Sequence, residues 1–476
     1  MPRSFRLPFA SPVAFAMACL LVSGCTSWRS GIGSAHPPQP ATFTMNGAEP
    51  LQDRWWEKWN DPQLNACIED ALSRNFSLSA AWARLEQAEA SLKRADAGRF
   101  PTLGASGNAR RDRSIGEDRE TIENDTGSVG LSASWEIDLW GRIRSTSNAA
   151  LLDRDATRED LHATAIALVG QIVQTWLQLA EQHGQRKLLS EQIALSERTL
   201  ELIQARFSRG QSGASDLWQQ ERLVESRRGN LILVEARIKS LEYALAVLMG
   251  KDPTTTRFPV IATLPVPPAF PSTGTPAEAL GRRPDVRSAW MKVEAADHRI
   301  AAAMAERFPR ISLSAGLSSP FSETLNLFNE WITSVAGSLG IPLIDGGSRR
   351  AEVDRTEAVL RQAISQYGDK WLTALREVED AILQEKTQRA YLSSIDTQIG
   401  LAERVFTQTT SRYEQGQVSY IQVLEAQQTL QTLQRNRVET ARAVASARVD
   451  LHKAIGGGFE LPANQAVESI LNTPES

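Results

Sequence analysis

The chain has 476 residues, with 52 Lys or Arg and 56 Asp or Glu, so its formal net charge is −4. A slightly acidic chain without a basic patch argues against nucleic acid as a partner. Aromatic residues make up only 7%, and Ala, Gln, Glu, Leu and Arg dominate the long middle stretches, which favours long helices over a compact α/β enzyme.

Residues 1–24 are predicted to be a signal peptide. Arg3 and Arg6 precede a short apolar core from Phe9 to Val22. A core this short is typical of a signal peptide rather than of a membrane-spanning helix. Its removal takes away two Arg and no acidic residue, so the formal net charge falls to −6.

The segment Leu21-Val22-Ser23-Gly24-Cys25 resembles a bacterial lipobox. In such a motif the Cys thiol receives a diacylglycerol and becomes the new N-terminus, which predicts lipidation at Cys25. The alternative is an ordinary signal peptide with a chance Cys. Thr26 follows, and the resemblance to lipoproteins implies release to the outer membrane. Only Cys67 then remains free, so no disulfide can form within the chain.

Residues 25–60 are predicted to form a lipidated N-terminal arm. The stretch is rich in Pro, Ser and Gly and ends with Trp55, Trp56 and Trp59. We expect these tryptophans to pack onto a helical body, because large aromatic side chains usually contribute buried area. A tryptophan-lined ligand site is the alternative.

A first repeat is predicted over residues 61–250, and it begins with a helix. Asp61-Pro62 starts this helix, with Pro in its first turn. Apolar residues keep a helical period until Phe100-Pro101, where the residue before Pro disfavours helix.

A β-hairpin is predicted next, over residues 101–139. Its first strand alternates weakly from Leu103 to Ala109, and its second alternates clearly from Val129 to Leu139. A charged loop, residues 110–127, is predicted between them. Strands of about ten residues have the length that crosses a bilayer at a tilt.

A long helix, a turn and a returning helix complete the first repeat. No Pro occurs from Arg142 to Arg209, and apolar residues step by three and four, as in a coiled coil. A helix of roughly 68 residues is about 100 Å long. The returning helix is predicted from Ala214 to Met249, and a Pro-rich linker follows over residues 251–276.

A second repeat is predicted over residues 277–456, because its motifs return in the same order. Ala279 to Pro309 aligns without gaps onto Ala71 to Pro101. Strands within 309–342, a long helix to about Gln415 and a returning helix from Tyr420 to Ile455 follow. Residues 457–476 are predicted to be a C-terminal tail.

The turns at the far ends of the long helices carry the same sequence pattern. Arg206-Phe207-Ser208-Arg209-Gly210-Gln211 matches Arg412-Tyr413-Glu414-Gln415-Gly416-Gln417. Gly ends each long helix, and Ser419 is placed to cap the next one. The chain therefore reads as a tandem duplication.

The helix lengths predict where along the long helices the non-helical segments lie. Two helices of roughly 36 residues, end to end, are about as long as one long helix. The short helices should therefore meet near its middle. We expect the linker, the N-terminal arm and the C-terminal tail to form a belt there.

Four transmembrane strands cannot close into a barrel, and an open edge in lipid leaves backbone groups unsatisfied. Known barrels have about eight strands or more. The chain is therefore predicted to form oligomers. Two copies would supply eight strands and three would supply twelve, and strand length does not choose between them.

With these motifs in place, the chain resembles the outer-membrane factor family, the TolC-like efflux ducts, and specifically its NodT-type lipoprotein branch. The resemblance rests on their order and spacing over nearly the whole mature chain: the lipobox, Trp55-Trp56 through Leu64, Phe100-Pro101, Trp135 through Arg142, Phe308-Pro309, Ile341 through Gly347, and both turns.

The resemblance implies an α+β membrane protein with four transmembrane β-strands and long coiled-coil helices per protomer. It implies a homotrimer whose 12-stranded β-barrel in the outer membrane continues as an α-helical tunnel through the periplasm. The implied partners are outer-membrane lipid, a periplasmic adaptor (membrane-fusion) protein and an inner-membrane pump of the resistance-nodulation-division type.

No catalytic or cofactor motif accompanies these features. The five His residues are scattered without metal-ligand spacing. The sequence has no phosphate-binding Gly loop and no Gly-x-Ser-x-Gly turn. We therefore expect neither an enzyme nor a bound cofactor or metal.

Three functions compete on the sequence alone. The first is a passive exit duct of a tripartite efflux or secretion system. The second is a coiled-coil envelope lipoprotein that acts as a periplasmic adaptor or scaffold, although an adaptor needs no barrel strands. The third is a lipid-anchored enzyme, for which no motif was found.

If the strands lie in the outer membrane, both turns lie at the periplasmic end and can close the tunnel. In the family, a Tyr bonds an acid here and acidic rings surround the pore. The resemblance places these roles on Tyr413 with Asp216, and on Glu425. Gln422 stands where some members have an acid, and Gly416 makes the turn. The alternative is that Tyr413 and Phe207 are only packing aromatics.

Overall fold

The computed structural model describes residues 37, 40–50, 52–115, 121–261, 263–321, 328, 330–456 and 459–462. The predicted signal peptide and Cys25 lie outside these residues. The described chain divides into two compact units. One comprises Leu85–Thr157 and Ser288–Gly368, and the other comprises Pro37–Arg84, Arg158–Arg287 and the residues from Asp369 onward.

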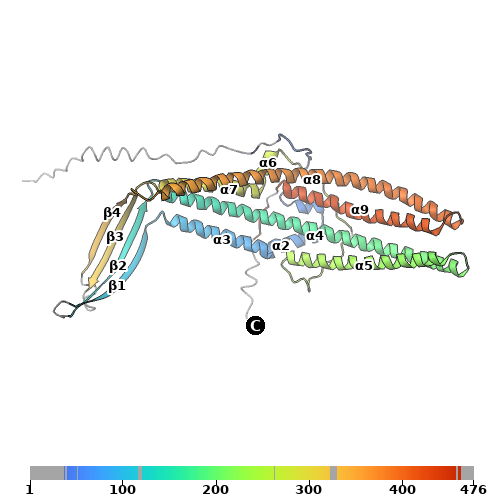
Figure 1. Ribbon diagram of the computed structural model, residues 1–476, viewed down its shortest axis with the longest axis horizontal. Helices are drawn as coiled ribbons and strands as arrows, with labels where there is room; N and C mark the ends of the chain where they lie inside the picture. The colour runs from blue at the N-terminus through green and yellow to red at the C-terminus, as the bar shows by residue number, and fades with distance from the viewer. Residues whose placement is uncertain are drawn as a thin grey trace, which may run out of the picture. The chain divides into compact units, whose positions relative to one another are not determined.

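The elements follow one another in an order that repeats (Figure 1). They are η1 (Trp55–Trp59), α2 (Pro62–Arg74), α3 (Phe76–Ala97), β1 (Thr102–Ile115), β2 (Thr121–Ile137), α4 (Arg142–Ser208), α5 (Ala214–Leu248), α6 (Pro276–Arg282), α7 (Pro284–Ala305), β3 (Arg310–Phe321), β4 (Ile332–Gly340), α8 (Ser348–Glu414) and α9 (Tyr420–Ala454).

The four strands form one antiparallel sheet in the order β1-β2-β3-β4. One face carries apolar side chains from β2, β3 and β4 in direct register, such as Trp135 opposite Leu313. Several of these side chains are exposed in the single protomer, among them Leu131 and Val335. In the described protomer β1 and β4 pair on one side only, which leaves two open edges.

The first hairpin is longer than the sequence predicts. Residues 110–127 were expected to be loop, but β1 continues to Ile115 and β2 begins at Thr121. Cross-strand ion pairs follow the register here: Arg111 contacts Asp125 at 2.6 Å and Arg113 contacts Glu123 at 3.7 Å. Opposite charges across a ladder stabilise strand pairing, so this charged stretch is sheet rather than loop.

Each predicted ascending helix is broken into two, as α2–α3 and α6–α7. The first break is at Asn75, whose Oδ1 accepts from the Leu78 N–H and whose Nδ2 donates to the Leu248 carbonyl, both at 2.9 Å. The second is at Arg283, whose Nη1 donates to the Ala454 carbonyl at 3.0 Å. Each of these side chains donates a hydrogen bond to the last carbonyl of a returning helix, which has no partner within its own helix.

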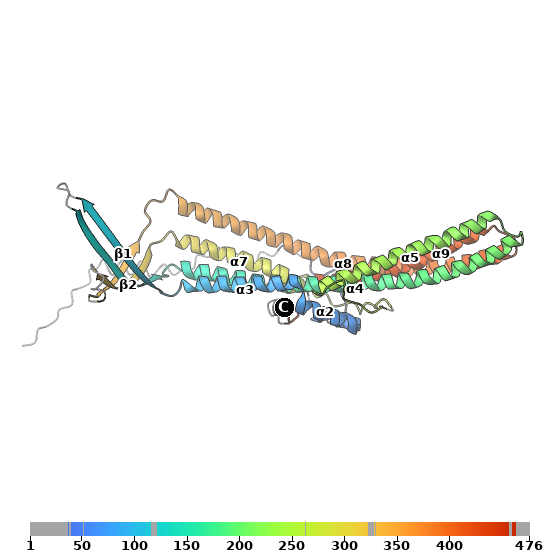
Figure 2. The same cartoon turned by 90° about the horizontal axis from the view of Figure 1, so that it is seen from below.

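The long helices pair with their returning helices as two hairpins (Figures 1 and 2), α4 with α5 and α8 with α9. The helix α9 also packs on α4: Arg442 Nε donates to Glu181 at 2.8 Å, and Gln174 Nε2 donates to the Ser446 carbonyl at 3.0 Å. Among the described helices, α4 alone is long and apolar enough to cross a membrane, but most of that stretch is buried, as in a core helix.

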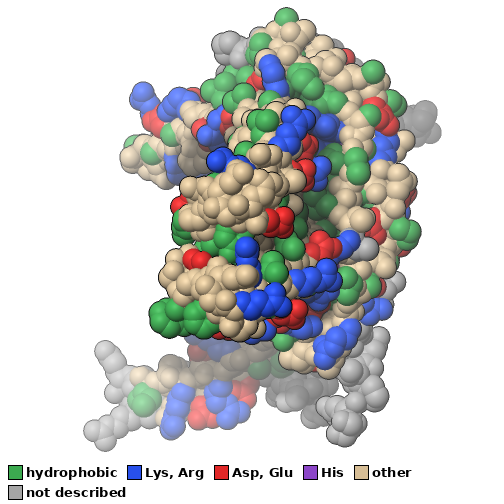
Figure 3. Space-filling view, turned by 90° about the vertical axis from the view of Figure 1, so that its right-hand side faces the viewer, with side chains coloured by type: hydrophobic (Ala, Val, Ile, Leu, Met, Phe, Trp, Pro, Cys, Tyr) green, Lys and Arg blue, Asp and Glu red, His purple; other side chains and the backbone are tan. Residues whose placement is uncertain are grey.

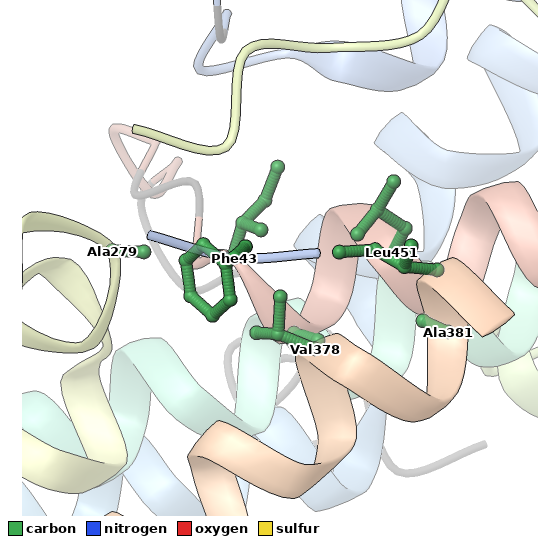
Figure 4. Packing of buried hydrophobic residues seen from close by; sticks show 8 residues of the cluster. Phe43, Ala279, Val378, Ala381 and Leu451 are labelled. Carbon is green, nitrogen blue, oxygen red and sulfur yellow. The ribbon is translucent and has the colours of Figure 1, made fainter. Parts of the chain in front are cut away.

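The N-terminal arm is held where α8 and α9 pack together. Phe43 lies in a buried cluster with Ala279, Val378, Ala381 and Leu451 (Figure 4). The indole of Trp55 stacks on His452 with ring centroids 5.0 Å apart, and Trp56 meets Phe459 edge to face at 4.9 Å. The predicted tryptophan packing is thus what the structure has.

The linker joins the same assembly. Buried Arg448 bonds Glu385 and donates to the carbonyls of Pro268 and Ala269. The Gly47 N–H donates to the Pro271 carbonyl at 3.2 Å. Arm, linker and the end of α9 therefore contact one another.

Candidate functional site

The two helix turns have the same backbone. In each, the residue after the glycine donates its N–H to a carbonyl five residues back: Gln211 to Arg206 and Gln417 to Arg412, both at 2.9 Å. This is the Schellman arrangement, which requires a left-handed residue. Gly210 has φ of 71° and Gly416 has φ of 73°, so both glycines are needed for their backbone freedom.

A view from the turn end shows the surface around these turns (Figure 3). Charged side chains of both signs are interspersed there with uncharged and hydrophobic ones. Gln422 and Glu425 are exposed near the start of α9. They lie three residues apart and so share a helix face. Ser419 occupies the N-cap position, but contrary to expectation its side chain makes no capping hydrogen bond.

A small core holds the two hairpins together just behind the turns. Its buried members are Ile203, Leu223, Tyr420, Val423 and Leu424, and Leu217, Phe406 and Tyr413 pack against them. The rings of Tyr413 and Tyr420 are 5.5 Å apart and tilted by 55°. The Arg206 guanidinium lies over the Tyr413 ring at 4.8 Å, close enough for a cation–π contact.

One buried hydrogen-bond chain crosses this core. The Tyr420 hydroxyl donates to Gln220 Oε1 at 2.6 Å, and Gln220 Nε2 donates to the Ser196 carbonyl at 2.6 Å. Burial raises the pKa of Tyr420, and the nearby Tyr413 and Asp216 add to the shift. The phenol therefore stays protonated as a donor, and it ties α9 to α5 and α4.

Asp216 and Tyr413, the predicted pair, both lie near the two turns, but their side chains do not form the predicted hydrogen bond. Asp216 accepts from the Ser212 hydroxyl at 3.0 Å. In the described part of the single protomer, no hydrogen bond joins it to Tyr413, whose contacts are with Tyr420 and Arg206. Within one chain the Tyr420–Gln220 bond takes the place of the predicted one.

A polar layer lies deeper between α4, α5 and α9. Arg227 is buried and donates to Gln431 Oε1. Burial, with Arg435 nearby, lowers the pKa of this guanidinium to about 10. Gln192 and Gln427 are buried in the same helices. Buried polar groups of this kind fix how helices pack more than they stabilise them.

Sequence reasoning missed Tyr420, Gln220 and Arg206. Tyr420 was expected only to begin a helix, and Gln220 is one of many Gln residues in the chain. A Gln at a position where the heptad predicts an apolar side chain was the available signal. No group of three or more His, Cys, Asp or Glu within the described ranges could hold a metal ion.

The outer membrane efflux protein family matches the chain over residues 67–251 and 275–457, one match in each repeat. The pyoverdine export outer membrane protein OpmQ of Pseudomonas aeruginosa is 30% identical over 93% of this chain and 96% of its own length. Nodulation protein T of Rhizobium leguminosarum bv. trifolii is 28% identical over 92% of this chain and 96% of its own.

Solved structures share the fold over most of the chain. The outer membrane protein VceC of Vibrio cholerae superposes with a TM-score of 0.78 at 26% sequence identity. The match covers 86% of this chain and all of the VceC chain. The mostly helical architecture with a four-stranded sheet is therefore that of known outer-membrane channels.

Proposed function

Because the chain belongs to the outer membrane efflux protein family, we propose that it is the outer-membrane exit duct of a tripartite efflux system, conducting substrates passively from an inner-membrane pump. One observation carries the assignment. Each repeat supplies two strands to a sheet that has open edges and an exposed apolar face. Such a sheet is suited to lipid only when copies of the chain close it into a barrel.

The finer architecture is a homotrimer with a 12-stranded barrel. Three copies of the four-stranded sheet close all six open edges, which satisfies the backbone in lipid. The long helices then form the periplasmic tunnel. A periplasmic adaptor and a resistance-nodulation-division pump complete the pathway, and the energy comes from the pump.

The test of this function uses a strain in which the gene for this chain has been deleted, together with the purified protein. Restored efflux on complementation, together with a heat-modifiable trimer that conducts ions in planar bilayers, is the expected result. A stable monomer in detergent without conductance would contradict the duct.

A lipid anchor at Cys25 is part of the proposal and has its own test. Mass spectrometry of the mature N-terminus should find a diacylglycerol on Cys25, and Cys25→Ser should leave the precursor uncleaved. An unmodified chain that begins at another residue would contradict the anchor. The barrel can insert without it, because acyl chains only tether the protein.

The turn end is the proposed periplasmic gate. Asp216, Tyr413, Gly416, Gln422 and Glu425 all lie at or near the turns, where hairpins from several copies would converge. A charge-assisted bond between Tyr413 and Asp216 would contribute about 1.5–3 kcal/mol per protomer to the closed state. Within a protomer the Tyr420–Gln220 hydrogen bond holds the start of α9 against α5, which would keep the two turns together in the closed state.

Bilayer recordings test the gate. Tyr413→Phe combined with Asp216→Ala should raise conductance, and Glu425→Gln should weaken cation preference because it removes a charged ring. Tyr413→Phe alone removes the hydroxyl of the same bond, so it should raise conductance in the same direction. An intact trimer with unchanged conductance in the double variant would place closure elsewhere.

A further inference from the structure

Three helices of one protomer, α4, α5 and α9, bury a column of polar side chains behind the turns. All six members are at least nine-tenths buried, and they are Gln192, Ser196, Gln220, Arg227, Gln427 and Gln431. The two members on each helix are four or seven residues apart, so they share one helix face. Hydrogen bonds join these faces: Arg227 donates to Gln431 Oε1, and Gln192 Nε2 donates to the Gln431 carbonyl at 3.5 Å.

The column contains a cation that no acidic side chain neutralises. Arg227 forms no ion pair with any residue that the structure describes, and the charged group acting on it is Arg435, a second cation. Arg435 has no acidic partner in the described ranges either. Glu225 on α5 is exposed and pairs instead with Arg228 at 2.6 Å. A buried charge is stable only beside a counter-charge, and the described chain supplies none here.

The same column has hydrogen-bond donors to spare. Arg227 Nε, Gln427 Nε2 and Gln431 Nε2 are buried and donate to no acceptor in the part of the chain that is described. The Arg227–Gln431 hydrogen bond keeps two of these side chains in contact. Gln427 lies about one turn before Gln431 on the same face of α9. Three donors and one positive charge are thus gathered between α5 and α9.

We propose that Arg227, Gln427 and Gln431 bind a small monovalent anion of the halide class, with chloride as the natural ligand. The guanidinium supplies the charge and a directed N–H, and the two amides supply further N–H groups. A water molecule would satisfy the donors but would leave the cation uncompensated. A small anion is favoured over a large one because the three helices enclose all three side chains.

The bound anion links two helices close to the turns. Gln427 lies about 10 Å along α9 from Tyr420, whose hydroxyl bonds Gln220 of α5. The anion adds a second polar link between α9 and α5 beyond that hydrogen bond. The site lies within one protomer, so it does not depend on the proposed duct.

The duplicated chain carries this site once. Arg142 begins α4 and Ser348 begins α8, so adding 206 to a residue number of the first hairpin gives its counterpart in the second. Arg227 then corresponds to Leu433, and Gln427 and Gln431 correspond to Glu221 and Glu225. Apolar and acidic side chains do not attract an anion, so we expect one site per protomer.

Hydrogen–deuterium exchange of the purified full-length protein in detergent tests the site, with chloride replaced by gluconate at constant ionic strength. If local opening releases the anion, peptides around Arg227 and Gln431 should exchange more slowly as chloride rises. The expected slowing is up to about tenfold for each tenfold rise above the dissociation constant. Peptides from the strands β1 to β4 should not respond.

Two neighbouring arginines provide the variant and its control. Arg227→Met removes the charge and the donors but keeps an unbranched side chain, so it should abolish the chloride response. Arg228→Met is the matched control, because Arg228 is exposed and pairs with Glu197 at 2.7 Å. It should keep the full response. No response in the parent, or a response of equal size in all three chains, would overturn the site.

Bromide gives a direct test on the unaltered chain. Crystals grown in bromide should show an anomalous difference peak in hydrogen-bond contact with Arg227 Nε. Density there without an anomalous signal would identify water and overturn the proposal. A peak without any chloride response in exchange would mean an adventitious ion only, which also overturns it. None of these measurements uses efflux, so failure of the site would leave the duct standing.

Discussion

The two repeats have the same backbone but different chemistry where each returning helix ends. In the first repeat the neutral amide of Asn75 bonds the last carbonyl of α5. In the second, buried Arg283 bonds the last carbonyl of α9 and also pairs with Asp285 at 2.9 Å and Glu377 at 2.7 Å. The last carbonyl of the helix requires only a hydrogen-bond donor. In the duplicated chain an amide is the donor in one repeat, and a guanidinium that also forms ion pairs is the donor in the other.

A second contrast lies two residues before these ends. Ala246 is buried in α5, and its counterpart in α9 is His452, buried against Trp55. Neither ring nitrogen of His452 has a hydrogen-bond partner among the described residues. The second repeat therefore holds a buried titratable group where the first has only a methyl group.

The largest effect is expected from Arg283→Ala. Losing this buried guanidinium leaves the Ala454 carbonyl without its donor and leaves Asp285 with Lys370 as its remaining cation, which costs about 3 kcal/mol of unfolding free energy. Asn75→Ala, the matched change in the first repeat, removes an uncharged donor and costs about 1–3 kcal/mol. Thermal unfolding in detergent, followed by circular dichroism, compares them. Equal decreases in Tm for the two variants would show that the ion pairs of Arg283 add no stability beyond the hydrogen bond to a helix-end carbonyl that Asn75 also makes.

The next largest difference between the repeats is expected in how the free energy of unfolding depends on pH. Burial, with Arg448 and Lys58 nearby, lowers the pKa of His452 from its usual 6.5 to about 3. The unfolded chain therefore takes up the proton first as the pH falls. The His452 contribution is complete above pH 6.5 and is lost toward pH 3, by about 1.4 kcal/mol per pH unit.

His452→Leu should flatten this slope, and the difference in Tm between variant and parent at pH 7 and pH 4.5 measures it. Asp285 does not interfere in this window. Although burial acts to raise it, Arg283 and Lys370 hold its pKa at about 2, so its contribution is lost only below about pH 4. Parallel pH profiles for variant and parent would contradict the expectation.

A smaller effect is expected from Tyr420→Phe at the turn end. The substitution leaves Gln220 Oε1 buried without its donor, which costs about 1–3 kcal/mol. Tyr243→Phe on α5 is the matched control, with an expected change within about 0.5 kcal/mol, because that side chain is exposed and lies outside the turn-end core. Similar losses of Tm in the two variants would mean that the Tyr420–Gln220 bond does not link the hairpins.

The smallest effects should be equal. Gly210→Ala and Gly416→Ala each force an L-residue into the left-handed region, which costs roughly 1–2 kcal/mol. Neither added Cβ would meet another atom within 4 Å, so no clash separates them. The two Tm values should fall together, and a clear difference between them would show that the turns are not equivalent.

Much of the fold follows from local patterns in the sequence. The long helices end where Gly allows a left-handed turn, and the strands begin after Phe100-Pro101 and Phe308-Pro309. The breaks at Asn75 and Arg283 could not be predicted, because the apolar period continues through both positions and their partners lie more than a hundred residues away. Tertiary hydrogen bonds overrode helix propensity there.

The site was only partly accessible from the sequence. Gly416 identified the turn because its backbone requirement is local. The Tyr420–Gln220 bond was hidden because it joins residues 200 positions apart and uses a common side chain. The sheet extension through Arg111 and Arg113 was hidden because charged residues usually predict a loop, and only the register reveals their acidic partners.

The anchoring of the N-terminal arm has a consequence for the order of folding. The Thr44 N–H donates to Glu379, 335 residues further along the chain, and Trp55 stacks on His452. At about 5–20 residues per second, synthesis of those 335 residues takes roughly 17–67 s. The helical hairpins have local contacts and can form earlier. The arm is thus the first segment made and among the last to reach its place, which delays commitment of the mature conformation until the whole chain has been synthesised.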